Sequence, residues 1–118
     1  MKKYKCKLIE YDKINMNHYV FRNSDIKTPS NTLPVFYNYN SDEEPLGKAM
    51  NFELNEDGLF CDIIVKDDLP TKFVGANVVI EENSFEDGNI LVIEKCELNG
   101  VSFIDEGVKE PNLEEYKE

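Results

Sequence analysis

The stretch KAMNFELNEDGLFCDIIV, residues 48–65, decides the expected fold. Two runs of residues that favour β-strands, 48–54 and 59–65, flank the sequence Asn55-Glu56-Asp57-Gly58. The glycine that ends this tetrapeptide can adopt the positive φ that a tight turn requires. The stretch therefore predicts a β-hairpin.

The chain on either side of this hairpin continues as short apolar runs separated by turns. We expect further strands at 3–11, 18–21, 34–37, 77–82, 89–97 and 101–104. The polar interval 22–34 predicts a loop with room for one helical turn, and 84–88 and 98–100 predict turns. Because no segment shows long helical periodicity, we expect a mainly β (β-rich α+β) fold, in which a mostly antiparallel sheet curls into a small, partly closed antiparallel β-barrel.

A chain of 118 residues has the size of one compact domain. We expect this single domain to occupy residues 1–108. Residues 109–118 are acidic and contain a proline, so we expect a C-terminal tail that is frayed, or helical only at 112–117.

Charge restricts the partners that the chain can have. Its 24 acidic and 13 basic residues give a formal net charge of -11, which opposes direct binding to nucleic acid. Lys3, Lys5 and Lys7 would share one face of a strand, which is typical of a solvated surface. No apolar run has the length of a membrane span or the place of a signal peptide, so we expect no membrane partner and a location in the bacterial cytoplasm.

Cofactor and metal chemistry are not indicated. Cys6, Cys61 and Cys96 are odd in number and lie far apart within apolar runs, which favours buried free thiols over a disulfide framework or a metal site. The glycines fall singly, so no phosphate-binding loop is predicted. We expect no cofactor.

Candidate catalytic groups are few. His18 is the one histidine, and a surface position is the common role of such a residue. Ser102 lacks the Gly-x-Ser-x-Gly surroundings of an activated nucleophile, so a hydrogen-bonded strand serine is the expected role. The carboxylate clusters, among them Asp42-Glu43-Glu44, lack the spacing of a calcium loop and are read as solvated charge.

Several segments, taken in order, resemble the tailed-phage prohead maturation proteases. The segments 33–40, 44–48, 56–62 and 96–107 read LPVFYNYN, EPLGK, EDGLFCD and CELNGVSFIDEG. They are similar to the family's Pro-Val-x-x-x-Asn-His-Asp, Pro-Ile-Gly-Lys, Gly-Leu and closing Val-Ser-Leu-Val-Asp motifs. The likeness covers roughly residues 15–111, although each motif is short. It implies the β-barrel fold that this family shares with herpesvirus assembly proteases.

The same comparison implies that the chain is a trimmed relative without activity. The family's general-base histidine falls on Tyr39, and a phenol with a pKa near 10 is a poor base at neutral pH. The nucleophilic serine falls on Phe73 or Val74, within a shortened stretch 68–75. We therefore expect a protein that is not an enzyme.

These observations predict a non-catalytic phage or prophage protein that binds other proteins in head assembly. Its partner would be a capsid or other head component, and the virion would be its second location. The expected binding residues are Tyr37, Tyr39, Asp42, Glu43 and Glu44. Ordinary strand packing is the alternative role of the two tyrosines.

Two other functions stay open at this point. A small acidic protein could inhibit a host defence or nucleic-acid-binding protein by imitating nucleic acid, which requires a continuous stripe of carboxylates. Residual hydrolase activity would need His18 to approach Ser102 or a carboxylate.

Overall fold

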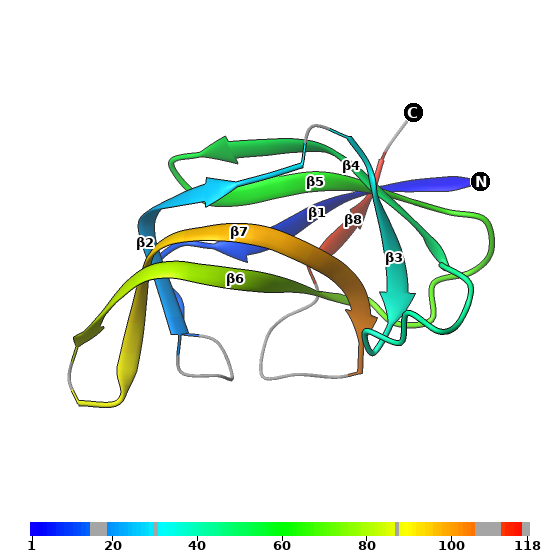
Figure 1. The fold of residues 1–118 in the computed structure, drawn as a ribbon. Helices are drawn as coiled ribbons and strands as arrows, with labels where there is room; N and C mark the ends of the chain where they lie inside the picture. Colours follow the sequence, from blue (N-terminus) through cyan, green and yellow to red (C-terminus); the bar gives the residue numbers. More distant parts are fainter. Residues whose placement is uncertain (15–18, 30, 87, 106–111, 117–118) are drawn as a thin grey trace.

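The computed structural model describes residues 1–14, 19–29, 31–86, 88–105 and 112–116, and these residues form eight strands and no helix (Figure 1). The strands are β1 Lys2–Glu10, β2 Tyr19–Lys27, β3 Leu33–Tyr37, β4 Gly47–Asn55, β5 Gly58–Val65, β6 Phe73–Glu86, β7 Ile90–Ile104 and β8 Leu113–Glu115. None of these segments is a helix with the length and apolar character of a membrane span. The predicted β-rich character is confirmed.

All eight strands belong to one mixed sheet in the order β2-β7-β3-β4-β5-β1-β8, with β6 paired to β7. The long strand β7 connects three other strands of this sheet. It pairs with β6 in antiparallel fashion along its length, with β2 in parallel through 91–97, and with β3 in parallel through 101–103. In Figure 1 the β6–β7 hairpin projects at the end of the molecule that carries β2.

The predicted partly closed barrel is not formed, whereas most strand pairs are antiparallel, as expected. The β2–β7 and β3–β7 pairs are parallel, and the sheet is not closed. Strand alternation indicates which residues face the core, but it carries no information on which distant strand becomes the neighbour. Between β1 and β6 the described residues form no ladder, and Asn112 bridges the two strands by hydrogen bonds instead.

The predicted hairpin at 48–65 is confirmed as β4 and β5. Asn55 lies opposite Gly58, and Gly58 has a φ of 138°. A Cβ atom at Gly58 would lie 2.0 Å from the carbonyl oxygen of Ile9 on the neighbouring strand β1. Glycine is therefore required here both by the turn and by the close approach of β1.

Three predicted loops and turns are strands in the structure. Residues 22–27 continue β2, residues 84–86 continue β6, and residues 98–100 lie inside β7. In β7 the register passes from Asn77–Gly100 to Val78–Leu98, so Asn99 is the extra residue of a β-bulge. A bulge and a turn both favour Asn and Gly, which explains why the local sequence does not separate them.

The C-terminal segment also differs from the prediction where it is described. Residues 113–115 form β8, which pairs with Tyr4, Lys5 and Cys6 of β1 in antiparallel register. Within 113–115 this strand replaces the predicted fraying or helix, while residues 109–111, 117 and 118 of the predicted tail lie outside the described residues.

The core follows the alternation of the strands. On β1 the side chains of Tyr4, Cys6 and Leu8 are buried, whereas Lys3, Lys5 and Lys7 are exposed, as predicted. The largest fully buried side chains elsewhere are Phe103, Leu59, Ile63, Ile93, Val20, Val35, Val65 and Val101. All three cysteines lie in this core, in agreement with the predicted burial.

Candidate binding site at the β3–β4 connection

The predicted site begins in a tight turn directly after β3. The backbone N–H of Asn40 donates to the carbonyl oxygen of Tyr37 at 3.1 Å, and the two central residues, Asn38 and Tyr39, have φ values of 50° and 58°. Positive φ at both central positions is the feature of a type I′ turn. Asn tolerates this conformation, but a bulky residue such as Tyr rarely adopts it.

Ser102 of β7 holds this turn in place. Its side chain is fully buried, and its Oγ accepts a hydrogen bond from the backbone N–H of Tyr39 at 2.8 Å. The same Oγ lies 2.9 Å from the carbonyl oxygen of Phe36 and 3.1 Å from that of Phe103, and one of these takes its proton. The expected role of Ser102 as a hydrogen-bonded strand serine is confirmed. His18 lies outside the described residues, so its position relative to Ser102 is not described.

The side chain of Tyr39 lies against Gly75, near the beginning of β6. Its side chain is 43% exposed, and a Cβ atom at Gly75 would lie only 2.7 Å from its Oη. The missing side chain of Gly75 thus makes room for the phenol. Partial burial raises the pKa of Tyr39 above its usual value near 10, so the phenol stays neutral at physiological pH.

Tyr37 is tied to the end of β7. Its hydroxyl donates to the carboxylate of Asp105, and the Nδ2 of Asn38 lies 3.4 Å from Oδ2 of the same residue. The hydrogen bond to Asp105 raises the pKa of Tyr37, which keeps the phenol protonated. Sequence reasoning did not identify Asp105 as a partner, because 67 residues separate it from Asn38 and no local pattern joins them.

The predicted acidic residues Asp42, Glu43 and Glu44 are exposed on the same connection. The side chain of Asn40 orders their backbone, because its Oδ1 accepts a hydrogen bond from the N–H of Asp42 at 3.2 Å. Within the described part of the chain none of the ion pairs involves these three carboxylates. They are exposed negative charges that follow the two tyrosines in the chain.

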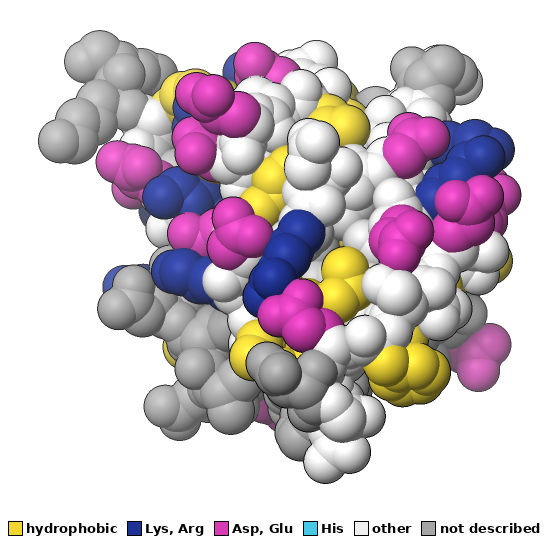
Figure 2. Space-filling view, turned by 90° about the vertical axis from the view of Figure 1, so that its left-hand side faces the viewer, with side chains coloured by type: hydrophobic (Ala, Val, Ile, Leu, Met, Phe, Trp, Pro, Cys, Tyr) yellow, Lys and Arg dark blue, Asp and Glu magenta, His cyan; other side chains and the backbone are white. Residues whose placement is uncertain are grey.

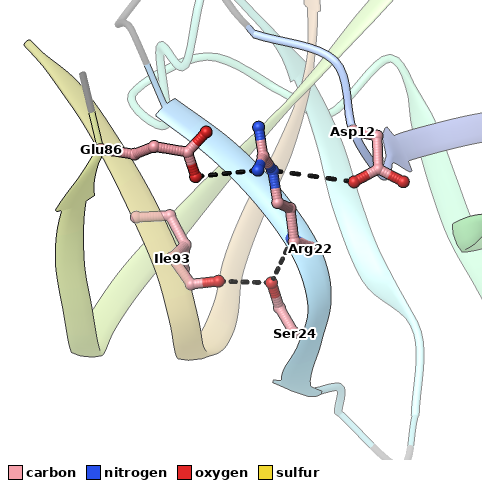
Figure 3. Close-up of polar contacts among 5 residues, drawn as sticks. All are labelled: Asp12, Arg22, Ser24, Glu86 and Ile93. Atoms are coloured by element: carbon pink, nitrogen blue, oxygen red, sulfur yellow. Dashed lines mark hydrogen bonds and ion pairs between the residues drawn. The ribbon is translucent and has the colours of Figure 1, made fainter.

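A second group of polar residues lies around Arg22, in the segment that the sequence predicted as a loop (Figure 3). Its guanidinium lies 2.8 Å from Glu86 and 3.8 Å from Asp12, and its backbone N–H donates to Oγ of Ser24. The buried Ser24 hydroxyl donates in turn to the carbonyl oxygen of Ile93 on β7. These contacts connect β2 with neighbouring segments. Because the charged groups are partly exposed, each ion pair contributes only about 0–1 kcal/mol to the free energy of unfolding.

A cleft of about 570 Å³ lies elsewhere, beside β1 and the β4–β5 turn. It is lined by Lys5, Lys7, Glu10, Tyr11, Asp12, Glu53, Asn55, Glu56, Asp57 and Phe60. The predicted binding residues do not line it. Among the residues that the structure describes, no group of three or more His, Cys, Asp or Glu side chains could hold a metal ion.

The fold and this site define the chain as an all-β domain with one mixed, open sheet. No family model, curated protein or solved structure matches it.

Proposed function

We propose that this chain is a non-catalytic, protein-binding domain of a phage or prophage. It is related to the tailed-phage prohead proteases and acts in head assembly through the β3–β4 connection. The observation that carries the proposal is Tyr39, a bulky residue that Ser102 holds at a φ of 58° while 43% of its side chain stays exposed. Strained residues of this kind persist where the surroundings impose them, and they are concentrated at binding and active sites.

Support for the family relationship comes from the contact between Tyr39 and Gly75. The resemblance assigns the family's base to position 39 and its nucleophile to position 73 or 74. The Oη of Tyr39 lies against Gly75, within two residues of both nucleophile positions. Base and nucleophile of one catalytic site must meet in this way, so the proximity of positions far apart in the sequence favours the relationship.

The residues at positions 39, 73 and 74 also support the proposal that catalytic activity has been lost. The phenol of Tyr39 has a raised pKa and does not accept a proton at neutral pH. The side chains of Phe73 and Val74 contain no nucleophilic atom. A relative with these substitutions retains a shaped surface where its ancestor had a cleft, and binding is the function that such a surface can keep.

The chemistry of the connection suits a protein partner. Tyr37 and Tyr39 present aromatic surface with restricted side chains, a composition that is enriched at protein interfaces. The exposed carboxylates 42–44 follow the two tyrosines on the same connection, and they would complement a basic region on a capsid component.

Photo-cross-linking tests the proposal. A photoreactive phenylalanine analogue replaces Tyr39 in the full chain during phage production, and adducts are identified by mass spectrometry. The matched control places the analogue at Phe85, an exposed aromatic residue of β6. We expect adducts with a capsid or scaffold component from position 39 and not from position 85. Equal labelling at both positions, or no adduct at position 39, would overturn the proposal.

The acidic inhibitor is the alternative function, and the same experiment separates it from the first. Adducts with a host nuclease or another defence protein would support the inhibitor. Mimicry of nucleic acid requires a continuous stripe of carboxylates, but on the face shown in Figure 2 acidic and basic side chains are intermixed. Two of the acidic residues of β6, Glu81 and Glu86, are paired with Lys27 and Arg22. The side chains on the face in Figure 2 therefore do not form the stripe that the inhibitor would require.

A further inference from the structure

Cys6 of β1 and Cys61 of β5 lie directly opposite each other in an antiparallel ladder. Side chains of opposite residues lie on the same face of a sheet, and their Cα atoms are about 4.5 or 5.5 Å apart, depending on the hydrogen-bonding pattern. A disulfide spans Cα separations of about 4.4 to 6.8 Å. The register thus meets the distance requirement in either pattern.

The two thiols also approach each other through their side chains. Both are free and buried, with 0% of Cys6 and 2% of Cys61 exposed. The Cys61 side chain interacts with that of Cys6, and this interaction together with burial raises the pKa of Cys6 well above its usual value. Because the thiolate is the reactive form and both thiols are buried, the pair reacts only when local opening of the native protein admits the oxidant, and the register then favours closure of the bond between them.

Cys96 is a third buried cysteine in the same core, and among the residues that the structure describes no cysteine lies opposite it in the sheet. It is equally buried, but it lies on β7 opposite Ile26 of β2 and Ile80 of β6. Burial raises its pKa to about 11, with the charges of Glu81 and Asp25 as further causes. Burial alone therefore does not distinguish Cys6 and Cys61, whereas their opposite register does.

We propose that Cys6 and Cys61 are a site of reversible disulfide formation, reduced in a thiol-rich cytoplasm and oxidised when the protein meets a small-molecule disulfide. One protein thiol loses its proton and attacks the small disulfide, which releases one small thiol and leaves a mixed disulfide. The second protein thiol loses its proton, attacks the protein sulfur of that bond and releases the second small thiol. Two electrons pass from the protein to the oxidant, and one disulfide replaces another.

The new bond would join β1 to β5 and close a loop of more than fifty residues. Such a cross-link restricts the unfolded chain and leaves the native ladder in place, because the register already brings the two residues together. We expect the oxidised protein to melt about 10 °C higher than the reduced protein.

The test incubates the purified full chain with oxidised glutathione under native conditions, and a parallel sample with dithiothreitol. Free thiols are then alkylated, and the protein is analysed by intact mass, peptide mapping and thermal melting. We expect a Cys6–Cys61 peptide, one alkylated cysteine at Cys96, and a raised melting temperature. Glutathione adducts without the internal bond, or a bond that forms only in urea, would overturn the proposal.

Single substitutions provide the matched controls. Cys96→Ala should leave both the Cys6–Cys61 bond and the shift in melting temperature unchanged. Cys61→Ala should abolish both, so that oxidation no longer alters the melting temperature. If Cys61→Ala does not fold, the wild-type and Cys96→Ala samples still decide the outcome, because each either contains the linked peptide or does not.

Discussion

Asp62 is a buried carboxylate on β5 that three residues contact. Only 8% of it is exposed, and it accepts hydrogen bonds from Nδ2 of Asn51 at 2.8 Å and from the hydroxyl of Tyr116, while Nζ of Lys3 lies 3.6 Å away. Burial by itself raises the pKa of Asp62, but the bonds from Tyr116 and Asn51 and the charge of Lys3 outweigh it. The pKa of Asp62 therefore lies below its usual value. The same hydrogen bond raises the pKa of Tyr116 to about 12.

These two shifts predict how stability depends on pH. The contribution of Asp62 is complete above its unfolded pKa of about 3.9 and disappears as the pH falls through its lower folded pKa. The contribution of Tyr116 is complete below its unfolded pKa of about 10 and disappears as the pH rises towards 12. We expect Asp62→Asn to lower the free energy of unfolding by about 1–3 kcal/mol at pH 7, with a smaller difference from wild type at pH 3.

Urea unfolding at both pH values measures this difference. Asp67→Asn is the control, because Asp67 is an exposed aspartate shortly after the same strand. It should change the free energy of unfolding by less than about 0.5 kcal/mol. Equal effects of the two substitutions at pH 7 would contradict the role given to the contacts of Asp62.

The residues with positive φ show how far residue type alone predicts backbone conformation. Asp12, Asn23, Asn38 and Asn51 have φ values between 47° and 64°, and Asp and Asn are the residues other than glycine that adopt this region most readily. The conformations of these four residues therefore agree with the preferences of their residue types. The conformation of Tyr39 does not agree with the preference of tyrosine, and its backbone N–H is bound by Ser102 from a distant strand.

At the scale of elements, Asn112 takes the place of a missing ladder between β1 and β6. Its Nδ2 donates to the carbonyl oxygens of Lys7 at 3.0 Å and Val74 at 2.8 Å, and its Oδ1 accepts from the N–H of Val74 at 2.9 Å. Its backbone oxygen also accepts from the N–H of Lys7 at 3.1 Å. One residue thus satisfies polar groups of two strands that do not pair with each other.

We expect Asn112→Ala to lower the free energy of unfolding by about 2 kcal/mol, because three side-chain hydrogen bonds are lost at a partly exposed position. Urea unfolding measures the loss, and hydrogen exchange should show a less protected Val74 amide. Asn83→Ala, at an exposed position of β6, is the control and should stay within about 0.5 kcal/mol of wild type. A fully stable Asn112→Ala protein would rule out the bridging role.

For the whole molecule, the excess of negative charge is the main electrostatic feature. The formal net charge is -11, while the ion pairs of the described residues involve side chains that are mostly part-exposed. Exposed pairs contribute about 0–1 kcal/mol each, and salt screens them. Repulsion among the unpaired carboxylates opposes the compact state and is screened as well.

Added salt should therefore stabilise the protein. We expect the free energy of unfolding in urea at pH 7 to rise by about 1 kcal/mol between 10 mM and 500 mM NaCl, because screening weakens the repulsion more than it weakens the exposed pairs. KCl should act equally if the effect is screening rather than binding of one cation. A fall in stability with salt would mean that the ion pairs dominate.

The sequence by itself determined the local features of this protein. The hairpin at 48–65, the alternation of buried Tyr4 and Cys6 with exposed lysines on β1, and the burial of the cysteines all follow from turn chemistry and side-chain polarity. These properties depend on residues that are close in the chain, so a single sequence is enough to predict them.

Only the tertiary structure decided the arrangement of the strands. It joined β2 and β3 to β7 in parallel, turned the predicted turn at 98–100 into a bulge, and placed β8 beside β1. It also brought Tyr39 to Gly75 and Tyr37 to Asp105, which gives the predicted tyrosines their surroundings. Such contacts join residues far apart in the chain, and their stability depends on the packing of the complete sheet, which no local pattern records.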